Sequence, residues 1–184
     1  MTSIDIPGYR AGTWVLDPAH SEVTFSVRHM MISKVRGSFG IKNATLVAPE
    51  NPLEASVTAS VDVTSIDTND ENRDAHLRSA DFFDTENFPS MEFVSTGARV
   101  EGGDFYVDGD LTIRGITKPV SFEFDFGGFG QDPYGNYKAG ASATAVINRE
   151  EFGLTWNAAL ETGGVLVGKD ITINLDLQGA LQQD

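Results

Sequence analysis

Hydrophobic and polar residues alternate along many short segments of this chain. In residues 22–29, for example, Val23, Phe25 and Val27 share one parity while Thr24 and Ser26 take the other. The same period of two recurs in residues 57–64, 104–114, 120–126, 140–147 and 171–178. Successive side chains of a β-strand point to opposite faces, so the pattern predicts strands with one apolar and one solvated face. Such strands are typical of antiparallel sheets.

Turn residues separate these segments and allow the strands to be counted. Gly102-Gly103 divides residues 91–101 from 104–114, and residues 132–136 read Asp-Pro-Tyr-Gly-Asn. The count is about eight, a number that closes into a small barrel. We therefore predict an all-β fold, an eight-stranded antiparallel barrel that forms a single domain over residues 1–184. Residues 1–12 are expected to form a loose N-terminal segment.

Two segments break the alternation. Residues 69–84 lack the strand pattern and predict one short helix, with Asn69 or Asp70 as the N-cap. Phe82 and Phe83 at the end of this segment are expected to pack over one end of the barrel. Residues 149–168 are irregular and contain Leu160 among other apolar side chains. Connections of this length in a compact barrel are usually functional, so we expect long covering loops here.

The composition disfavours several classes of partner and of chemistry. The net charge of −14 repels phosphate backbones and anionic headgroups, so we expect neither nucleic-acid binding nor electrostatic docking on a membrane. No stretch approaches the roughly 20 apolar residues of a membrane span, so stable membrane insertion is not expected. The chain has no cysteine. Its first residues lack the basic and apolar regions of a signal peptide, which predicts a cytoplasmic protein, or a periplasmic or secreted one if a leader has been removed.

Small residues on the predicted inner face leave two interpretations of the barrel interior open. Residues 140–147 place Ala141, Ala143 and Ala145 on one parity. These alanines either pack against bulky neighbours such as Phe122 and Phe124, which would fill the barrel, or border a hollow apolar tube suited to a chain-like ligand. Barrels of this size are found both filled and holding one small ligand, and the pattern alone does not separate the two.

Several longer motifs together resemble the YceI-like proteins. They span nearly the whole chain in order: Trp14-Val-Leu-Asp-Pro-Ala-His-Ser21, Lys34-Val-Arg-Gly-Ser-Phe39, Ser65-Ile-Asp-Thr68, Arg73-Asp-Ala-His-Leu77, Asp81-Phe-Phe-Asp84, Gly109-Asp-Leu-Thr-Ile-Arg-Gly-Ile-Thr-Lys-Pro-Val120 and Ile147-Asn-Arg-Glu-Glu-Phe-Gly-Leu154. The resemblance implies a lipocalin-like barrel that binds a long-chain polyisoprenoid lipid or an isoprenoid quinone in an elongated central pocket. It also implies a role in transport, storage or sequestration, and is compatible with a homodimer. It supplies no catalytic residues and no cofactor other than the bound lipid.

The inward parity and the aromatic residues of the irregular segments give a predicted apolar pocket. Its residues are Phe25, Val27, Val61, Val63, Phe82, Phe83, Phe93, Leu111, Ile113, Phe122, Phe124, Ala141, Ala143, Ala145, Phe152, Leu154 and Trp156. Two polar residues are candidates for contacts with a ligand headgroup. His29 ends an inward-facing parity, and Arg149 follows the alanine segment; each has an alternative structural role, which for Arg149 is pairing with Glu150, Glu151 or a helix carboxylate.

Catalytic and metal chemistry find little support in the sequence. The three histidines, His20, His29 and His76, lack the local spacing of a metal site, so no metal is expected. No nucleophile elbow, phosphate-binding loop or dinucleotide motif is present. A non-enzymatic lipid-binding protein is the favoured hypothesis. The alternatives are an enzyme acting on an isoprenoid inside the barrel, and a filled barrel that serves as an interaction module.

Overall fold

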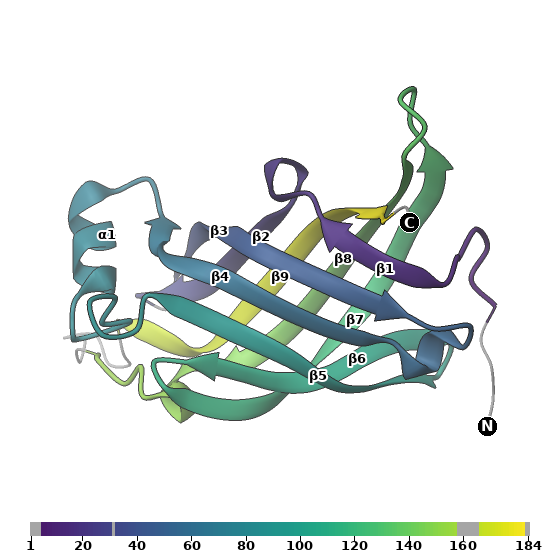
Figure 1. The fold of residues 1–184 in the computed structure, drawn as a ribbon. Coiled ribbons are helices and arrows are strands. Elements are labelled where there is room, and N and C mark those ends of the chain that lie inside the picture. The colour runs from purple at the N-terminus through teal and green to yellow at the C-terminus, as the bar shows by residue number, and fades with distance from the viewer. Residues whose placement is uncertain (1–4, 31, 158–165, 183–184) are drawn as a thin grey trace.

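The described part of the fold consists almost entirely of β-strands, with one α-helix at one end (Figure 1). The structure is a computed structural model, and it describes residues 5–30, 32–157 and 166–182. The strands in this part of the chain are β1 (Gly12–Leu16), β2 (Glu22–His29), β3 (Ser33–Ala48), β4 (Ser56–Asp67), β5 (Ser90–Glu101), β6 (Asp104–Ile113), β7 (Ile116–Gln131), β8 (Tyr137–Asn148) and β9 (Val167–Leu181). The helix is α1 (Glu71–Arg78), and short 3-10 turns lie at Pro18–His20, Pro52–Glu54 and Arg149–Phe152.

These strands form a closed antiparallel barrel. Neighbouring strands pair in the order β1-β3-β2-β9-β8-β7-β6-β5-β4, and β4 pairs with β3 to close the ring. β1 and β2 share one position in the ring, between β3 and β9, where they lie end to end and pair with different parts of those two strands. Trp14 of β1 pairs with Leu46 and Leu181, whereas Val23 of β2 pairs with Phe39 and Leu175. Nine strand segments therefore fill eight positions, which confirms the predicted eight-stranded barrel.

Local sequence explains several of the predicted boundaries. Gly102 and Gly103 have φ values of +59° and +86°, and the two-residue turn that joins β5 to β6 requires positive φ at both. The Asp70 side chain accepts hydrogen bonds from the main-chain N–H groups of Asn72 and Arg73, so it caps α1 as expected. Among the described residues, no helix is long and apolar enough to cross a membrane.

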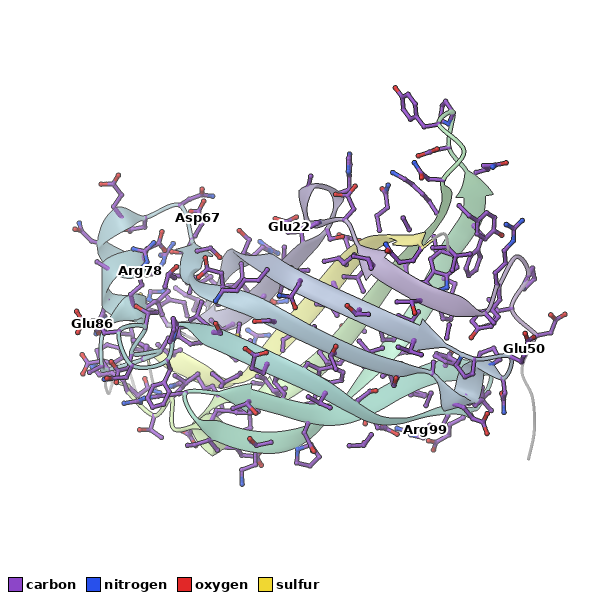
Figure 2. All side chains as sticks on the ribbon, viewed as in Figure 1. Glu22, Glu50, Asp67, Arg78, Glu86 and Arg99 are labelled. Atoms are coloured by element: carbon purple, nitrogen blue, oxygen red, sulfur yellow. The ribbon has the colours of Figure 1, made fainter. Side chains whose placement is uncertain are left out.

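The barrel has two distinct ends (Figure 1). We call the end that carries α1 the helix end; it also holds the β2–β3 connection and residues 149–157. The opposite end carries the described N- and C-terminal segments, and we call it the termini end. In Figure 2, Asp67, Arg78 and Glu86 mark the helix end, whereas Glu50 and Arg99 lie toward the termini end. The fully buried large side chains, Phe152, Ile66 and Val63, belong to the helix end.

Candidate ligand-binding site

Two apolar cavities lie inside the barrel and adjoin one another. The outer cavity, toward the termini end, has a volume of about 160 Å³ and is bordered by Trp14, Phe126 and Phe129 among others. The inner cavity has a volume of about 140 Å³ and reaches Met91 and Ile113. The residues that border both are Leu16, Ala44, Val57, Phe124 and Leu177. We treat the two cavities as adjoining compartments of one apolar lumen.

An N-terminal strap, which we define as residues 5–11, crosses the termini end of this lumen. The Tyr9 hydroxyl donates a hydrogen bond of 2.6 Å to the carbonyl of Pro49, which follows β3. The Tyr137 hydroxyl of β8 donates one of 2.5 Å to the carbonyl of Gly8. Tyr9 itself borders the outer compartment. The described part of the segment predicted to be loose therefore makes these contacts with the barrel, while residues 1–4 lie outside the described part.

The helix end of the barrel is packed, unlike the lumen. Phe152, Val63 and Leu154 are among the most deeply buried residues of the core, with exposed fractions of 0%, 2% and 5%. The Phe82 ring lies over this end, where it contacts the rings of His76 and Trp156 at centroid distances of 5.1 and 5.3 Å. This packing closes the lumen beyond Ile113.

Glycine makes room for one of the rings that narrows the lumen. A Cβ placed on Gly109 of β6 would lie 2.4 Å from Cζ of Phe93, because the Phe93 ring lies across that backbone. The ring then meets Phe122 edge-on at a centroid distance of 5.4 Å. Phe93 and Phe122 both border the inner compartment. The absence of a side chain at Gly109 therefore makes room for the Phe93 ring and does not add to the empty space.

The structure divides the seventeen predicted pocket residues between the lumen and the packed end. Those that border the lumen are Val61, Phe93, Leu111, Ile113, Phe122, Phe124 and Ala141. Those that border neither compartment and lie in or against the core are Phe25, Val63, Phe82, Phe83, Ala143, Ala145, Phe152, Leu154 and Trp156. Val27 is half-buried on β2 and borders neither compartment. The alanine segment is divided as well. Ala141 borders the outer compartment, whereas Ala143, which lies opposite Phe124 in the β7–β8 register, and Ala145 are buried and border neither compartment.

Arg149 is an internal anchor of the helix end. Its side chain is 2% exposed, and its guanidinium donates to the main-chain carbonyls of Gly168 (2.7 Å), Leu154, Trp156 (3.1 Å) and Val167 (3.2 Å). Its hydrogen-bonding partners are therefore carbonyl groups, and not the carboxylates that the sequence suggested. Burial lowers the pKa of the guanidinium below its ordinary value, while the charge of nearby Glu150 acts in the opposite direction.

The motif residues around α1 have a similar anchoring role. Asp74 is buried and accepts hydrogen bonds from the N–H and the hydroxyl of Thr68. Arg73 donates to the hydroxyl and the carbonyl of Thr68, and Arg78 donates to the carbonyls of Thr64 and Ile66. These bonds tie α1 to the end of β4. The motifs that stand out in the sequence therefore build the cover of the helix end.

The remaining candidate polar residues lie outside the lumen. His29 is half-buried at the end of β2, where it pairs with Ser33 of β3 and Val167 of β9. The imidazoles of His20 and His76 contact the carboxylates of Asp17 and Asp81 at 2.7 and 2.9 Å. Within the described ranges, no group of three histidine, aspartate or glutamate side chains is arranged to hold a metal ion. The predicted covering segment is described only in part, because residues 158–165, including Leu160, fall outside those ranges.

Several lumen residues were missed by sequence reasoning. They are Tyr9, Trp14, Leu16, Ala44, Leu46, Val57, Phe126, Phe129, Ala139 and Leu177. Leu177 shares the parity of Ile173 and Leu175 on β9, so the alternation was a usable signal for it. Tyr9 has no such signal, because the segment around it is neither strand nor helix.

Sequence comparison relates the chain to bacterial proteins of similar length. A UPF0312 protein of Staphylococcus aureus strain USA300 is 37% identical over 172 residues, which cover 92% of this chain and 98% of that protein. The solved YceI protein of Campylobacter jejuni is 25% identical, with a TM-score of 0.67, and the match covers 85% of this chain and 90% of that one.

Two further solved structures share the fold at lower identity. BcnA of Burkholderia cenocepacia has a TM-score of 0.76 at 23% identity, covering 89% of this chain and 98% of that one. A polyisoprenoid binding domain from Saccharophagus degradans has a TM-score of 0.67 at 12% identity, and the match covers 92% of this chain and 98% of that one. The model of the YceI-like domain matches residues 14–179, from Trp14 of β1 to Gly179 of β9. This chain therefore belongs to the YceI-like family.

Proposed function

We propose that this protein binds an isoprenoid lipid or isoprenoid quinone in the barrel lumen and acts as its carrier or reservoir. The observation that carries the proposal is the pair of adjoining apolar compartments between the strap and Ile113. The solved relative from Saccharophagus degradans, described as a polyisoprenoid binding domain, supports the choice of ligand class. A branched apolar chain suits a narrow tube lined by aliphatic and aromatic side chains.

The size of the lumen limits how much chain it takes up without rearrangement. An engineered protein cavity of about 150 Å³ accepts one benzene molecule, and each compartment here is close to that volume. Each buried CH₂ group contributes about 0.8 kcal/mol gross, so even a short isoprenoid would gain substantial binding energy. A longer chain must displace lumen side chains such as Phe93 or leave part of its length at the mouth. Affinity measured over a series of isoprenoid lengths separates these cases.

The lining of the lumen favours binding over catalysis. Among the described residues that line it, the ionisable side chain besides Tyr9 is that of Glu92, whose carboxylate accepts a hydrogen bond of 3.0 Å from Ser60 on the exposed face of the sheet. The Arg149 guanidinium is engaged by main-chain carbonyls. The alternative, an enzyme that acts on an isoprenoid inside the barrel, would need a polar reactive group directed at the chain.

Mass spectrometry of organic extracts tests the proposal on protein purified without detergent. We expect a prenyl lipid at close to one equivalent. Adding an isoprenoid to the delipidated protein should raise the melting temperature, because a ligand at one hundred times its Kd stabilises the native state by about 2.7 kcal/mol. A fatty acid of equal carbon number serves as the matched control. A mixture of substrate and product would favour the enzyme, and no extractable lipid together with no thermal shift would contradict the proposal.

A further inference from the structure

The lumen is blind at the helix end and ends beneath the strap at the other. Ile113, at the deep limit of the inner compartment, is only 3% exposed, and the fully buried side chains of the helix end lie beyond it. At the termini end the outer compartment is bordered by Tyr9 of the strap. A chain that reaches the lumen from the helix end must pass through a close-packed core, which resists such displacement. A chain that arrives from the termini end meets, among the described residues, the strap and the rings of Trp14, Phe129 and Tyr137, whose centroids are 5.8–6.2 Å apart.

The strap spans the mouth between opposite walls of the barrel. At one side Tyr9 bonds to Pro49, just after β3. At the other, Gly8 lies so close to β7 that a Cβ built on it would be 2.8 Å from Cβ of Phe129. In the ring of eight positions, β3 and β7 are separated by three others on each side. The strap therefore crosses the opening instead of following its rim.

A small number of contacts holds the strap. Besides the bonds of the two tyrosine hydroxyls, the Trp14 indole N–H donates a hydrogen bond of 3.1 Å to the carbonyl of Arg10. The Arg10 guanidinium lies 3.7 Å from the centre of the Tyr137 ring. Residues 5–11 pair with no strand, and most of them are exposed. Segments with few buried contacts open at far lower free energy than the strands around them.

We propose that the ligand enters beneath this strap with its apolar tail first, and that the strap then closes over the bound chain. The inference rests on the proposed function. The inner compartment is lined by aliphatic and aromatic side chains apart from Glu92, whose carboxylate bonds to Ser60 on the exposed face of the sheet. The outer compartment is bordered by Tyr9 of the strap, whose polar hydroxyl bonds to the Pro49 carbonyl at the mouth. The tail of the ligand therefore lies toward Ile113 and its polar end lies at the termini end.

A reversible disulfide across the mouth tests this route. The chain has no cysteine, so a Gly8→Cys/Phe129→Cys pair would form a single defined bridge. The Cβ separation of a disulfide is about 3.5–4.5 Å, so the strap needs to shift by roughly 1 Å from its present position. Because Gly8 has φ +90°, a cysteine there is strained. Each single cysteine variant therefore accompanies the pair.

A second engineered disulfide, at the helix end, is the matched control; we call the two disulfides the mouth staple and the helix-end staple. A Cβ built on Gly168 of β9 would lie 3.3 Å from Cβ of Arg28 on β2, so Arg28→Cys/Gly168→Cys joins two strands far from the mouth. Both positions lie outside the lumen lining. Both proteins are measured oxidised and reduced, so each serves as its own reference.

The readout is the rate at which a farnesyl chain with a dansyl group on its polar end is taken up. We expect the oxidised mouth staple to load at least tenfold more slowly than its reduced form, and the helix-end staple to load equally fast in both states. Equal rates for the mouth staple, or slowing by the helix-end staple instead, would overturn the route. If the reduced proteins and the wild type bind no probe at all, the proposed function itself is wrong and the route falls with it.

A single-atom variant keeps the test decisive if the staple fails to form. Tyr137→Phe retains the ring beneath Arg10 and removes only the hydroxyl that bonds to Gly8. Loss of one such hydrogen bond changes an opening equilibrium by about fivefold, so the dansyl probe should leave about five times faster. Tyr134→Phe, in the exposed β7–β8 turn, should leave the rate unchanged. Identical release from both variants would contradict a closing strap.

Discussion

The two ends of this barrel share most of their strands but differ in how their interiors are filled. At the helix end, Phe152, Ile66 and Val63 are fully buried, and α1 is tied down by arginine and aspartate side chains. At the termini end, the inward-facing Phe124 and Leu177 remain half-buried because they border empty space. The comparison shows that a strand's alternation fixes which face turns inward. Whether the inward side chains pack against other side chains or border empty space depends on residues from distant strands.

The largest effect should come from removing the buried cation of the packed end. Arg149→Met removes the guanidinium donor from the main-chain carbonyls of Gly168, Leu154 and Trp156, whereas the Val167 carbonyl keeps the Asn157 amide. Each buried carbonyl left unpaired costs about 1–3 kcal/mol. We expect a loss of at least about 3 kcal/mol in the free energy of unfolding, measured by urea denaturation. Arg36→Met on the exposed face of β3 is the control and should change little. Similar stability of the two variants would refute the anchoring role.

Truncation of one phenylalanine at each end sharpens the comparison. Phe152→Ala opens a cavity in close-packed core and should cost about 3–5 kcal/mol. Phe124→Ala should cost roughly half of that, because one side of its ring already faces empty space. Calorimetry on the lipid-free proteins measures both changes. Equal losses would mean that the lumen is as tightly packed as the core.

Enlarging an alanine at each end tests the same difference in reverse. Ala145→Phe on β8 overpacks the core and should destabilise the protein by about 1–3 kcal/mol. Ala141→Phe, four residues earlier on the same face, should leave the melting temperature of the lipid-free protein nearly unchanged and weaken isoprenoid binding. Thermal unfolding and a binding titration are made on both variants. An Ala141→Phe protein that binds normally but melts several degrees lower would show a filled barrel.

The smallest effect concerns the strap at alkaline pH. Burial and the charge of Glu50 raise the pKa of the Tyr9 hydroxyl above its ordinary value of about 10. The protonated hydroxyl donates to Pro49, so this contribution is present below about pH 10 and is lost as the pH rises through the raised pKa. We expect faster ligand release above that range in the wild type, with a weaker dependence in Tyr9→Phe. The same pH dependence in both proteins would show that Tyr9 does not hold the strap.

The alternation in the sequence was sufficient to predict the barrel, because side-chain parity along a strand is a local property. It assigned Leu111 and Phe122 to the inner face correctly, since both are buried and border the lumen. The capping chemistry of Asp70 located the helix. The family resemblance had the same basis in local motifs, and the comparison with known proteins confirmed it.

The position of the empty space could not be predicted in this way. Ala141 and Ala145 have the same type and the same parity, yet Ala141 borders the lumen and Ala145 packs in the core. The partners of Arg149 are main-chain carbonyls, which leave no trace in residue identities. The strap has no periodicity, and its role depends on contacts with residues as distant in sequence as Tyr137.

Alanine methyl NMR spectra recorded with and without an isoprenoid test the central claim most directly. Ala44, Ala59 and Ala141 border the lumen, whereas Ala145 lies in the packed core. Saturating farnesol should shift the methyl resonances of the first three strongly and leave that of Ala145 close to its original position. The largest shift at Ala145, with Ala44 and Ala141 unchanged, would place the ligand at the helix end and contradict the account.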